Sequence, residues 1–312
     1  MPLVNDPELS VIAVPPYLEL MVKHLKPLQL NTFDKDNIFV FFHLRKCGGT
    51  TLRNAIHAAL NESMDIAGQQ WIPCLDSPCV PYSIPPTGKS VYASHLSFTN
   101  MLATTREAET QRKNMDKLLL SDGRNYTYNS LQDGFKGCLT NLRGTVSRVI
   151  SCWNYRMMKF GMPPASELTA RDWDTLLPKV YDEFNNGCNN EIFRAFGSPS
   201  QDETLVNTIN YAHPSFSFEL NRAAHRLSTC VVVIPDRCNE SNAVLSHFIP
   251  WLENFDLCRE KLNMNPLQSK NTTLSEEATK AILRHNQLDD ILFHFGEKLF
   301  EDQVRIAMQG GY

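Results

Sequence analysis

One segment near the beginning of the chain, residues 38–53, constrains the fold more than any other. It reads IFVFFHLRKCGGTTLR, in which a largely apolar run (residues 38–44) leads into a glycine pair and then a helical pattern. A buried strand followed by a Gly-rich turn and a helix forms an anion site, because backbone N–H groups and the helix dipole favour negative charge. Lys46 adds a point charge, and Thr50 and Thr51 add hydroxyl donors. The segment therefore predicts that the chain binds a phosphate-like group here.

The rest of the chain alternates between apolar strand patterns and helical patterns. This alternation predicts an α/β fold with a mainly parallel central sheet and helices on both faces. We expect strands at residues 38–44, 90–95, 137–142 and 230–234, and helices at 50–61, 146–159, 220–226, 243–252 and from a cap at Thr273 or Ser275 to about 307. Residues 71–89 read as loop and 163–190 as irregular. The expected domains are an N-terminal lead (1–35) and one large domain (36–307) with a helical and loop insertion at about 99–134.

The glycine turn is not the loop of nucleoside triphosphatases. That loop, G-x-x-x-x-G-K-[ST], places Lys after the second glycine and beside the hydroxyl that binds Mg²⁺. Here Lys46 precedes Gly48 and Gly49, and the motif occurs nowhere else in the chain. A kinase that uses ATP and Mg²⁺ therefore lacks its signature.

A second candidate phosphate site follows the expected strand at 137–142. The chain continues LRGTVSRVISCWNYR, which puts Arg143 at the carboxyl end of the strand, where ligands bind in open α/β sheets. Arg offers a bidentate fork for phosphate. Ser151 lies eight residues on, two helical turns along, where its hydroxyl could share an anion with Arg143.

The two segments together resemble sulfotransferases, in particular the Golgi-type carbohydrate enzymes related to heparan sulfate 2-O- and 6-O-sulfotransferases. The family's 5′-phosphosulfate loop reads roughly H-x-x-K-[TC]-[GA]-[GS]-T-[ST], and its 3′-phosphate motif roughly L-R-[DE]-P-[VI]-x-R-x-x-S. In this chain Gly144 and Thr145 replace the acidic–proline pair, which affects the expected turn geometry more than the phosphate contact. The resemblance covers about residues 37–303, and the matching positions are His43, Lys46, Gly48, Gly49, Thr50, Thr51, Leu142, Arg143, Val146, Arg148, Ser151, Asn286, Asp289 and Phe300.

The resemblance implies a P-loop-like three-layer fold and one donor, 3′-phosphoadenosine 5′-phosphosulfate, without a metal. Arg143 and Ser151 would bind its 3′-phosphate, and Arg148 would be partly structural. The loop residues Arg45, Lys46, Cys47, Gly48, Gly49, Thr50 and Thr51 would bind its 5′-phosphosulfate.

Sulfuryl transfer to a hydroxyl needs a base for the acceptor proton and a positive charge at the departing phosphate. Lys46 suits the second task. His95 ends the expected strand at 90–95 on the same edge and matches the family's catalytic His, so we expect it to be the base. His43, which precedes the loop, is interpreted as a structural residue of the first strand.

Composition limits the partners. The net charge is −4 and the pI about 6.1, so nothing indicates nucleic-acid or membrane-surface affinity. No run of 18 apolar residues exists, whereas Golgi relatives carry an N-terminal anchor. Either an anchor has been lost from the sequence and the protein works in the Golgi lumen, or it works in the cytosol.

Three functions remain open at this point. The first is sulfation of a carbohydrate hydroxyl, and the second is a cytosolic sulfotransferase for a small alcohol or phenol. The third is a nucleotide-binding module without catalysis. The sequence specifies neither the acceptor nor the oligomeric state.

The nine cysteines are an odd number, so at least one thiol is unpaired within the chain. Cys47, in the anion loop, is the expected free thiol. Cys74 with Cys79, or Cys230 with Cys238, could close a small disulfide. A zinc site is not expected, because no C-x₂-C pair recurs with His partners.

Overall fold

The computed structural model of the chain describes residues 39–62, 70–74, 90–94, 98, 137–157, 161–177, 188–197, 216–259 and 274–309. The N-terminal lead (1–35), the insertion at 99–134 and His95 lie outside the described residues.

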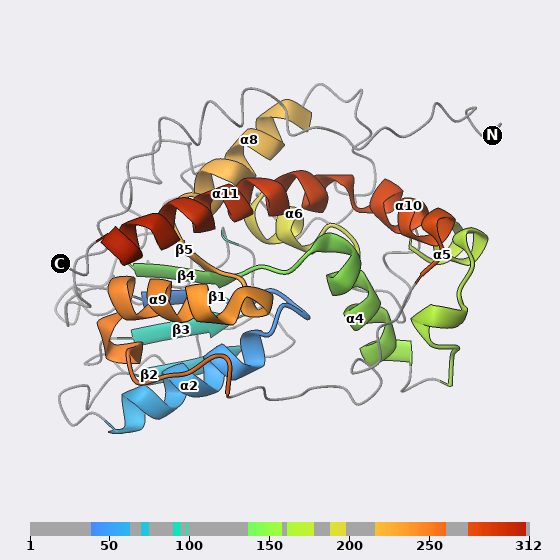
Figure 1. The fold of residues 1–312 in the computed structure, drawn as a ribbon. Helices are drawn as coiled ribbons and strands as arrows, with labels where there is room; N and C mark the ends of the chain where they lie inside the picture. Colours follow the sequence, from blue (N-terminus) through green and yellow to red (C-terminus); the bar gives the residue numbers. More distant parts are fainter. Residues whose placement is uncertain are drawn as a thin grey trace, which may run out of the picture.

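Among the described residues, five strands form one sheet in which every neighbouring pair is parallel (Figure 1). The order is β2-β3-β1-β4-β5, so β1, the first of the described strands, lies in the middle. Phe42, the last residue of β1, is level with Ser94 of β3 and Thr140 of β4. The carboxyl ends of the three central strands therefore meet at one edge. The strands are β1 (Phe39–Phe42), β2 (Gln70–Cys74), β3 (Ser90–Ser94), β4 (Gly137–Asn141) and β5 (Val231–Val233).

Helices pack on both faces of the sheet, as expected for an α/β protein. Successive side chains of a strand point to opposite faces. Accordingly, the Phe42 ring contacts Phe196 of α6 at a centroid distance of 5.3 Å, whereas Phe41 stacks on His43, whose ring lies against Gly49 at the beginning of α2. The helices are α2 (Gly49–Glu62), α4 (Thr145–Met157), α5 (Ala170–Leu176), α6 (Glu191–Phe196), α8 (Phe216–Leu227), α9 (Cys238–Phe248), α10 (Glu276–His285) and α11 (Gln287–Gln309), with 3-10 turns at Ala165–Glu167, Pro235–Arg237 and Pro250–Leu252.

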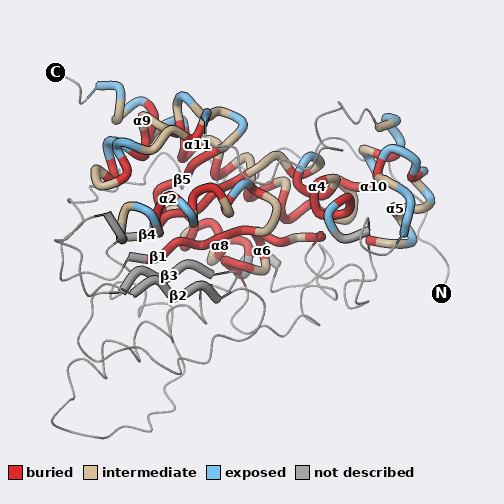
Figure 2. Tube along the Cα trace, turned by 90° about the horizontal axis from the view of Figure 1, so that it is seen from below, coloured by how far each residue is buried: buried red, intermediate tan, exposed pale blue. Residues whose placement is uncertain are grey.

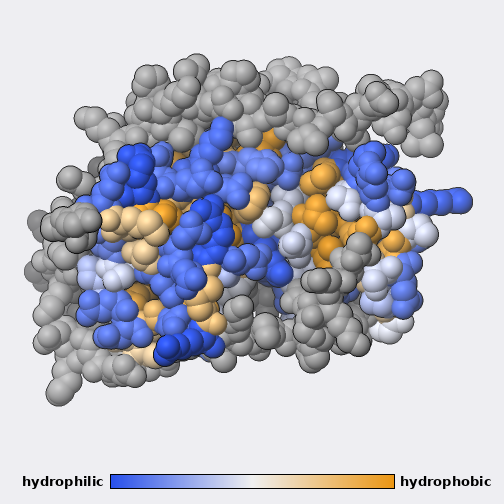
Figure 3. All heavy atoms as spheres, in the orientation of Figure 1, coloured by the Kyte–Doolittle hydropathy of each residue, from blue (hydrophilic) through white to orange (hydrophobic). Residues whose placement is uncertain are grey.

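The long helix α11 covers the outer edge of β5. An uncovered edge strand leaves its backbone N–H and C=O groups unpaired. Here the Gln303 side chain accepts a hydrogen bond from the Val232 N–H (2.8 Å) and donates one to the Cys230 carbonyl (3.0 Å). The opposite side of α11 is hydrophilic and faces solvent (Figure 3), with Glu297, Lys298, Glu301 and Arg305 along it.

The buried apolar side chains form two groups. The larger surrounds the sheet, and Figure 2 shows buried residues in β1 and β5 and at intervals along α11. The smaller lies between α4, α5 and α10, where Trp153 and Trp173 pack edge to face at 5.4 Å.

Several sequence predictions of secondary structure were wrong. Residues 70–74 form strand β2 within the expected loop, which is possible because Pro73 lies in an edge strand, where a missing N–H costs little. Residues 170–176 form α5 within the expected irregular segment, and the Thr169–Asp172 capping box begins it. The helix expected at 243–252 begins earlier, at Cys238, and ends at Phe248.

The last expected helix is two helices. Ser275 caps α10 through a bond from the Ala278 N–H, as one of the two expected caps. The helix then breaks at Asn286, whose carboxamide oxygen accepts hydrogen bonds from Arg148 and from the Asn190 N–H. The backbone of Asn286 leaves the helical region (φ −126°, ψ 27°), which separates α10 from α11.

Among the described residues, disulfides join Cys138 to Cys230, Cys152 to Cys188 and Cys238 to Cys258. The suggested Cys230–Cys238 pair is therefore wrong, because each of these cysteines bonds to a distant partner. Cys47 is a free, buried thiol, as expected. Cys79 lies outside the described residues, so the Cys74–Cys79 pairing stays a prediction.

Candidate anion site at the carboxyl edge of the sheet

Two loops lie side by side at the carboxyl edge because they follow neighbouring strands. Residues 45–48 follow β1 and lead into α2, and residues 142–144 follow β4 and lead into α4. The Asn141 side chain at the end of β4 donates a hydrogen bond of 2.7 Å to the Cys47 carbonyl. The Asn141 side chain is fully buried, and its bond fixes one loop to the other.

Left-handed backbone at two residues shapes the first loop. Lys46 has φ 63° and Gly48 has φ 83°. A non-glycine residue in this region is uncommon and costs energy, and such residues concentrate at functional sites. The glycines also allow close packing, since a Cβ at Gly48 would lie 2.9 Å from Pro235 and one at Gly49 would lie 2.0 Å from the His43 ring. His43 is buried beneath the loop, in keeping with its interpretation as structural.

The helices that follow the two loops differ from others in the structure in their first turns. Neither α2 nor α4 carries an acidic residue there. By contrast, α5, α6, α9, α10 and α11 each have at least one Asp or Glu in the first turn. The N-termini of α2 and α4 therefore keep the positive end of the helix dipole uncompensated by their own side chains. Of the two loop threonines, Thr50 is half-buried and Thr51 is buried, with its N–H bonded to the Gly48 carbonyl (3.2 Å).

Lys46 extends from the loop toward α4. Its ammonium nitrogen lies 3.9 Å from the centroid of the Tyr155 ring, a cation–π distance. Tyr155 is 49% exposed. It was not among the expected site residues, since sequence spacing does not show which side chain of α4 reaches the loop.

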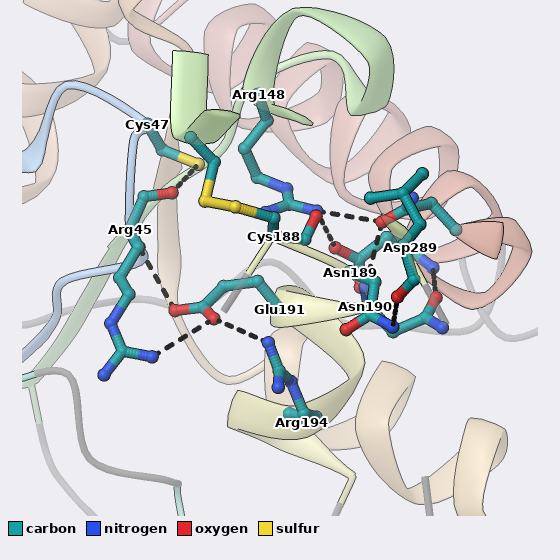
Figure 4. The surroundings of a disulfide bond; sticks show 12 residues. Arg45, Cys47, Arg148, Cys188, Asn189, Asn190, Glu191, Arg194 and Asp289 are labelled. Carbon is teal, nitrogen blue, oxygen red and sulfur yellow. Dashed lines mark hydrogen bonds and ion pairs between the residues drawn. A yellow bond between two sulfur atoms is a disulfide. The ribbon is translucent and has the colours of Figure 1, made fainter. Parts of the chain in front are cut away.

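Arg45 is paired within the protein. Its backbone N–H donates to Glu191 Oε1 (3.3 Å), and its guanidinium lies 3.6 Å from Glu191 Oε2. Glu191, at the beginning of α6, also pairs with Arg194 at 3.3 Å, so one buried carboxylate lies between two arginines (Figure 4). This contact anchors the loop at Arg45 and reduces the positive charge that Arg45 could offer to a ligand.

Cys47 is an inert thiol. Burial raises the pKa of its thiol to about 12, although Arg148 and Arg143 act in the opposite direction. At neutral pH it is therefore protonated and a poor nucleophile. Its Sγ donates to the Arg45 carbonyl at 3.6 Å. Any ligand contact at this position would have to come from the backbone N–H.

Arg143 lies at the second loop, next to the first. Its Nε is 3.5 Å from an Asp236 carboxylate oxygen, in a pair whose side chains are 26% and 63% exposed. Ser151 is two turns into α4 and is buried. The structure thus brings Lys46 and Arg143 to adjacent strand ends, with Ser151 and Tyr155 on the helix that follows Arg143.

His95, the expected base, lies outside the described residues. The described strand β3 ends at Ser94, which is level with Phe42 at the same edge of the sheet. The role of His95 stays a prediction.

Arg148 has a structural role, as expected. Its guanidinium is fully buried, lies 3.1 Å from Asp289, and donates to Asn286 and to the Cys188 carbonyl (Figure 4). Burial raises the pKa of the Asp289 carboxyl, and Arg148 together with the Phe193 and Ile192 N–H groups opposes that rise. These bonds join α4 to the beginning of α6 and to α11.

Four residues of the site were missed by sequence reasoning: Asn141, Tyr155, Glu191 and Asp236. A signal existed for Asn141, because a polar residue at the end of a buried strand beside Arg143 suggests a contact to a neighbouring loop. The others depend on which distant segments pack together.

Within the described ranges, no three His, Cys, Asp or Glu side chains are grouped as a metal ion would require. No described helix has the length and apolar character of a membrane span. No protein-family model matches this chain, and no curated protein matches its sequence.

Proposed function

We propose that this protein is a sulfotransferase that moves the sulfuryl group from 3′-phosphoadenosine 5′-phosphosulfate to an acceptor hydroxyl, with a carbohydrate as the acceptor. One observation carries the proposal. The neighbouring strands β1 and β4 end in loops that bear Lys46 and Arg143, and each loop leads into a helix without an acid in its first turn. Two neighbouring anion sites, each with a basic side chain, suit one ligand with two separate phosphate groups.

The residues present fit such a donor. The left-handed backbone at Lys46 and Gly48 turns the chain directly into α2, whose first N–H groups can donate to a 5′-phosphosulfate. Arg143 can exchange its exposed partner Asp236 for a 3′-phosphate, because a half-exposed ion pair contributes little free energy. Ser151 would add a hydroxyl to that contact. The central position of β1, followed by the loop and α2, supports a P-loop-like arrangement.

The donor supplies a sulfuryl group, whose bond to the 5′-phosphate oxygen breaks with its electron pair as the acceptor oxygen bonds to sulfur. Lys46 stabilises the negative charge on the departing phosphate, and no metal is needed for that task. His95, the residue after β3, takes the proton of the acceptor hydroxyl. Arg45 and Cys47 hold the loop rather than the ligand, since Glu191 pairs with Arg45 and the Cys47 side chain is buried.

The three disulfides support a site of action in an oxidising compartment such as the Golgi lumen. Disulfides persist in secretory compartments and are rare in the cytosol. They favour the carbohydrate enzyme over the cytosolic enzyme for small alcohols.

The binding test compares adenosine 3′,5′-bisphosphate with AMP by isothermal titration calorimetry. We expect the bisphosphate to bind at least about tenfold more tightly, because a charge-assisted contact to a second phosphate contributes roughly 1.5–3 kcal/mol. Arg143→Ala should remove most of this preference. Arg305→Ala, on the exposed side of α11, is the matched control and should leave both affinities unchanged. Equal affinity for the two nucleotides would rule out the donor assignment.

The transfer test uses radiolabelled donor with a panel of glycans and small alcohols. We expect label on a glycan, and we expect His95→Ala to abolish transfer while the bisphosphate still binds. Tight binding without transfer to any acceptor would instead support the nucleotide-binding module.

A further inference from the structure

The side chain of Lys46 leaves its loop in a direction set by the backbone. The residues on either side are fixed, since the Arg45 N–H bonds to Glu191 and the Cys47 carbonyl bonds to Asn141. Lys46 between them is held at φ 63°. Because L-residues adopt this conformation at a cost, the neighbouring contacts must maintain it. The loop therefore aims Lys46 in one direction.

Tyr155 lies where that side chain ends. It stands on the last turns of α4, four residues after Ser151, and residues at this spacing share one side of a helix. Ser151 is 2% exposed and Tyr155 is 49% exposed, so Tyr155 is the outer residue of the two. Its ring face lies 3.9 Å from the Lys46 ammonium nitrogen.

The ring is a neutral partner for a cation. Arg45 and Arg143, the other basic residues of the two loops, contact the carboxylates of Glu191 and Asp236. A carboxylate repels an incoming phosphate, whereas an aromatic face attracts an ammonium group through its quadrupole and adds no negative charge. Contact with Tyr155 therefore restrains Lys46 without adding a negative charge beside it.

We propose that Tyr155 is a positioning residue, whose ring face holds the Lys46 ammonium at the outer side of the anion loop before the donor arrives. The proposal rests on the function proposed above. A cation held in place need not lose side-chain freedom when the ligand binds, so catalysis gains from pre-organisation. The ring face, and not the phenolic hydroxyl, supplies the effect.

The test uses the full chain with Tyr155→Phe, which keeps the ring, and Tyr155→Leu, which keeps an apolar side chain without a ring. With saturating donor we expect Tyr155→Leu to lower kcat about threefold to tenfold, with the KM for the acceptor unchanged. Tyr155→Phe should stay within about twofold of the natural protein. Thermal unfolding followed by circular dichroism shows whether each variant is folded.

A second readout does not depend on activity. Reductive methylation with ¹³C-formaldehyde labels lysine amines, and Lys46→Arg identifies the Lys46 signal. We expect a ring-current shift of that signal in the natural protein and in Tyr155→Phe, and its loss in Tyr155→Leu.

The positioning role would be overturned if Tyr155→Leu left kcat unchanged and the Lys46 signal of the natural protein showed no ring-current shift. So would a loss of kcat in Tyr155→Phe as large as that in Tyr155→Leu, because the hydroxyl would then be the active group. If the natural protein transfers no sulfuryl group, the proposed function fails, and the Lys46 signal alone decides whether Tyr155 holds the ammonium.

Discussion

Arg143 and Arg148 lie five residues apart in one motif, yet they occupy opposite kinds of environment. Arg148 is fully buried and bonded to Asp289, Asn286 and the Cys188 carbonyl. Arg143 is partly exposed and pairs with the mostly exposed Asp236 at 3.5 Å. A buried arginine with fixed partners joins elements of the fold, while a partly exposed one with a solvated partner can exchange that partner for a ligand. Arg148 therefore forms the structural part of the motif, and Arg143 forms its proposed binding part.

The largest expected effect comes from replacing each arginine by methionine, which has a long apolar side chain. Arg148→Met should lower the free energy of unfolding by about 3–5 kcal/mol, because it leaves the buried Asp289 carboxylate without its cation. Arg143→Met should change it by less than about 1 kcal/mol. Urea denaturation measures both. Adding Asp289→Leu to Arg148→Met should restore part of the loss, and equal effects of the two single variants would contradict the comparison.

The next effect concerns the disulfide beside Arg148. Cys152–Cys188 ties α4 to the segment that provides the Cys188 carbonyl for Arg148 and, three residues later, Glu191 for Arg45. Replacing both cysteines by alanine should destabilise the protein by about 2–4 kcal/mol. The same double change at Cys138 and Cys230, which joins the amino ends of β4 and β5 at the end of the sheet opposite the two loops, is the control. We expect only the variant without Cys152–Cys188 to bind adenosine 3′,5′-bisphosphate more weakly than the natural protein. Equal affinity in the two double variants would show that this disulfide does not affect the anion loop.

The third effect is a pH dependence of stability that comes from the Cys47 thiol, which lies near both arginines. Its folded pKa is raised to about 12 by burial, above the usual value near 9, so the unfolded chain loses the thiol proton first as pH rises. Its contribution to stability is therefore present below about pH 9 and falls between about pH 9 and 12, by about 1.4 kcal/mol per pH unit. Urea denaturation of the natural protein and Cys47→Ala at pH 8 and pH 10 measures the difference. A constant difference between them would mean that the thiol is not desolvated.

The smallest effect concerns the partner of Arg143. Asp236→Asn keeps the shape of the side chain and removes its charge, so Arg143 no longer has to give up an ion pair when a phosphate binds. We expect affinity for adenosine 3′,5′-bisphosphate to rise about 1.4-fold to fivefold, since partly exposed pairs contribute roughly 0.2–1 kcal/mol. Asp302→Asn, at the exposed pair with Arg305, is the control. Weaker binding in Asp236→Asn would show that Asp236 orients Arg143 for the ligand.

Local patterns were enough to predict the parts of the fold that build the candidate anion site. The strand–glycine–helix order of β1 and α2, and the strand and helix around Arg143, depend on residues close together in the sequence. Strand β2 was missed because Pro73 argues against a strand unless its place at the sheet edge is known. The break at Asn286 was missed because the apolar helical pattern continues across it from α10 into α11.

The candidate site was predictable as a set of residues but not as a set of contacts. Lys46 and Arg143 could be named because glycines and strand ends mark them. Their partners Tyr155 and Asp236, and the second contact of the loop at Glu191, follow from the packing of α4, the β5–α9 turn and α6. No spacing rule gives that packing, because it depends on how helices from separate parts of the chain meet at the sheet.

The amide of Gln303 has a consequence for self-association. It takes the place of a sixth strand, so the Val232 N–H and the Cys230 carbonyl cannot pair with an extended peptide or with a neighbouring copy. Growth of the sheet from β5 would first require α11 to detach together with the apolar residues that it buries. The described edge at β5 is therefore protected against strand-to-strand aggregation.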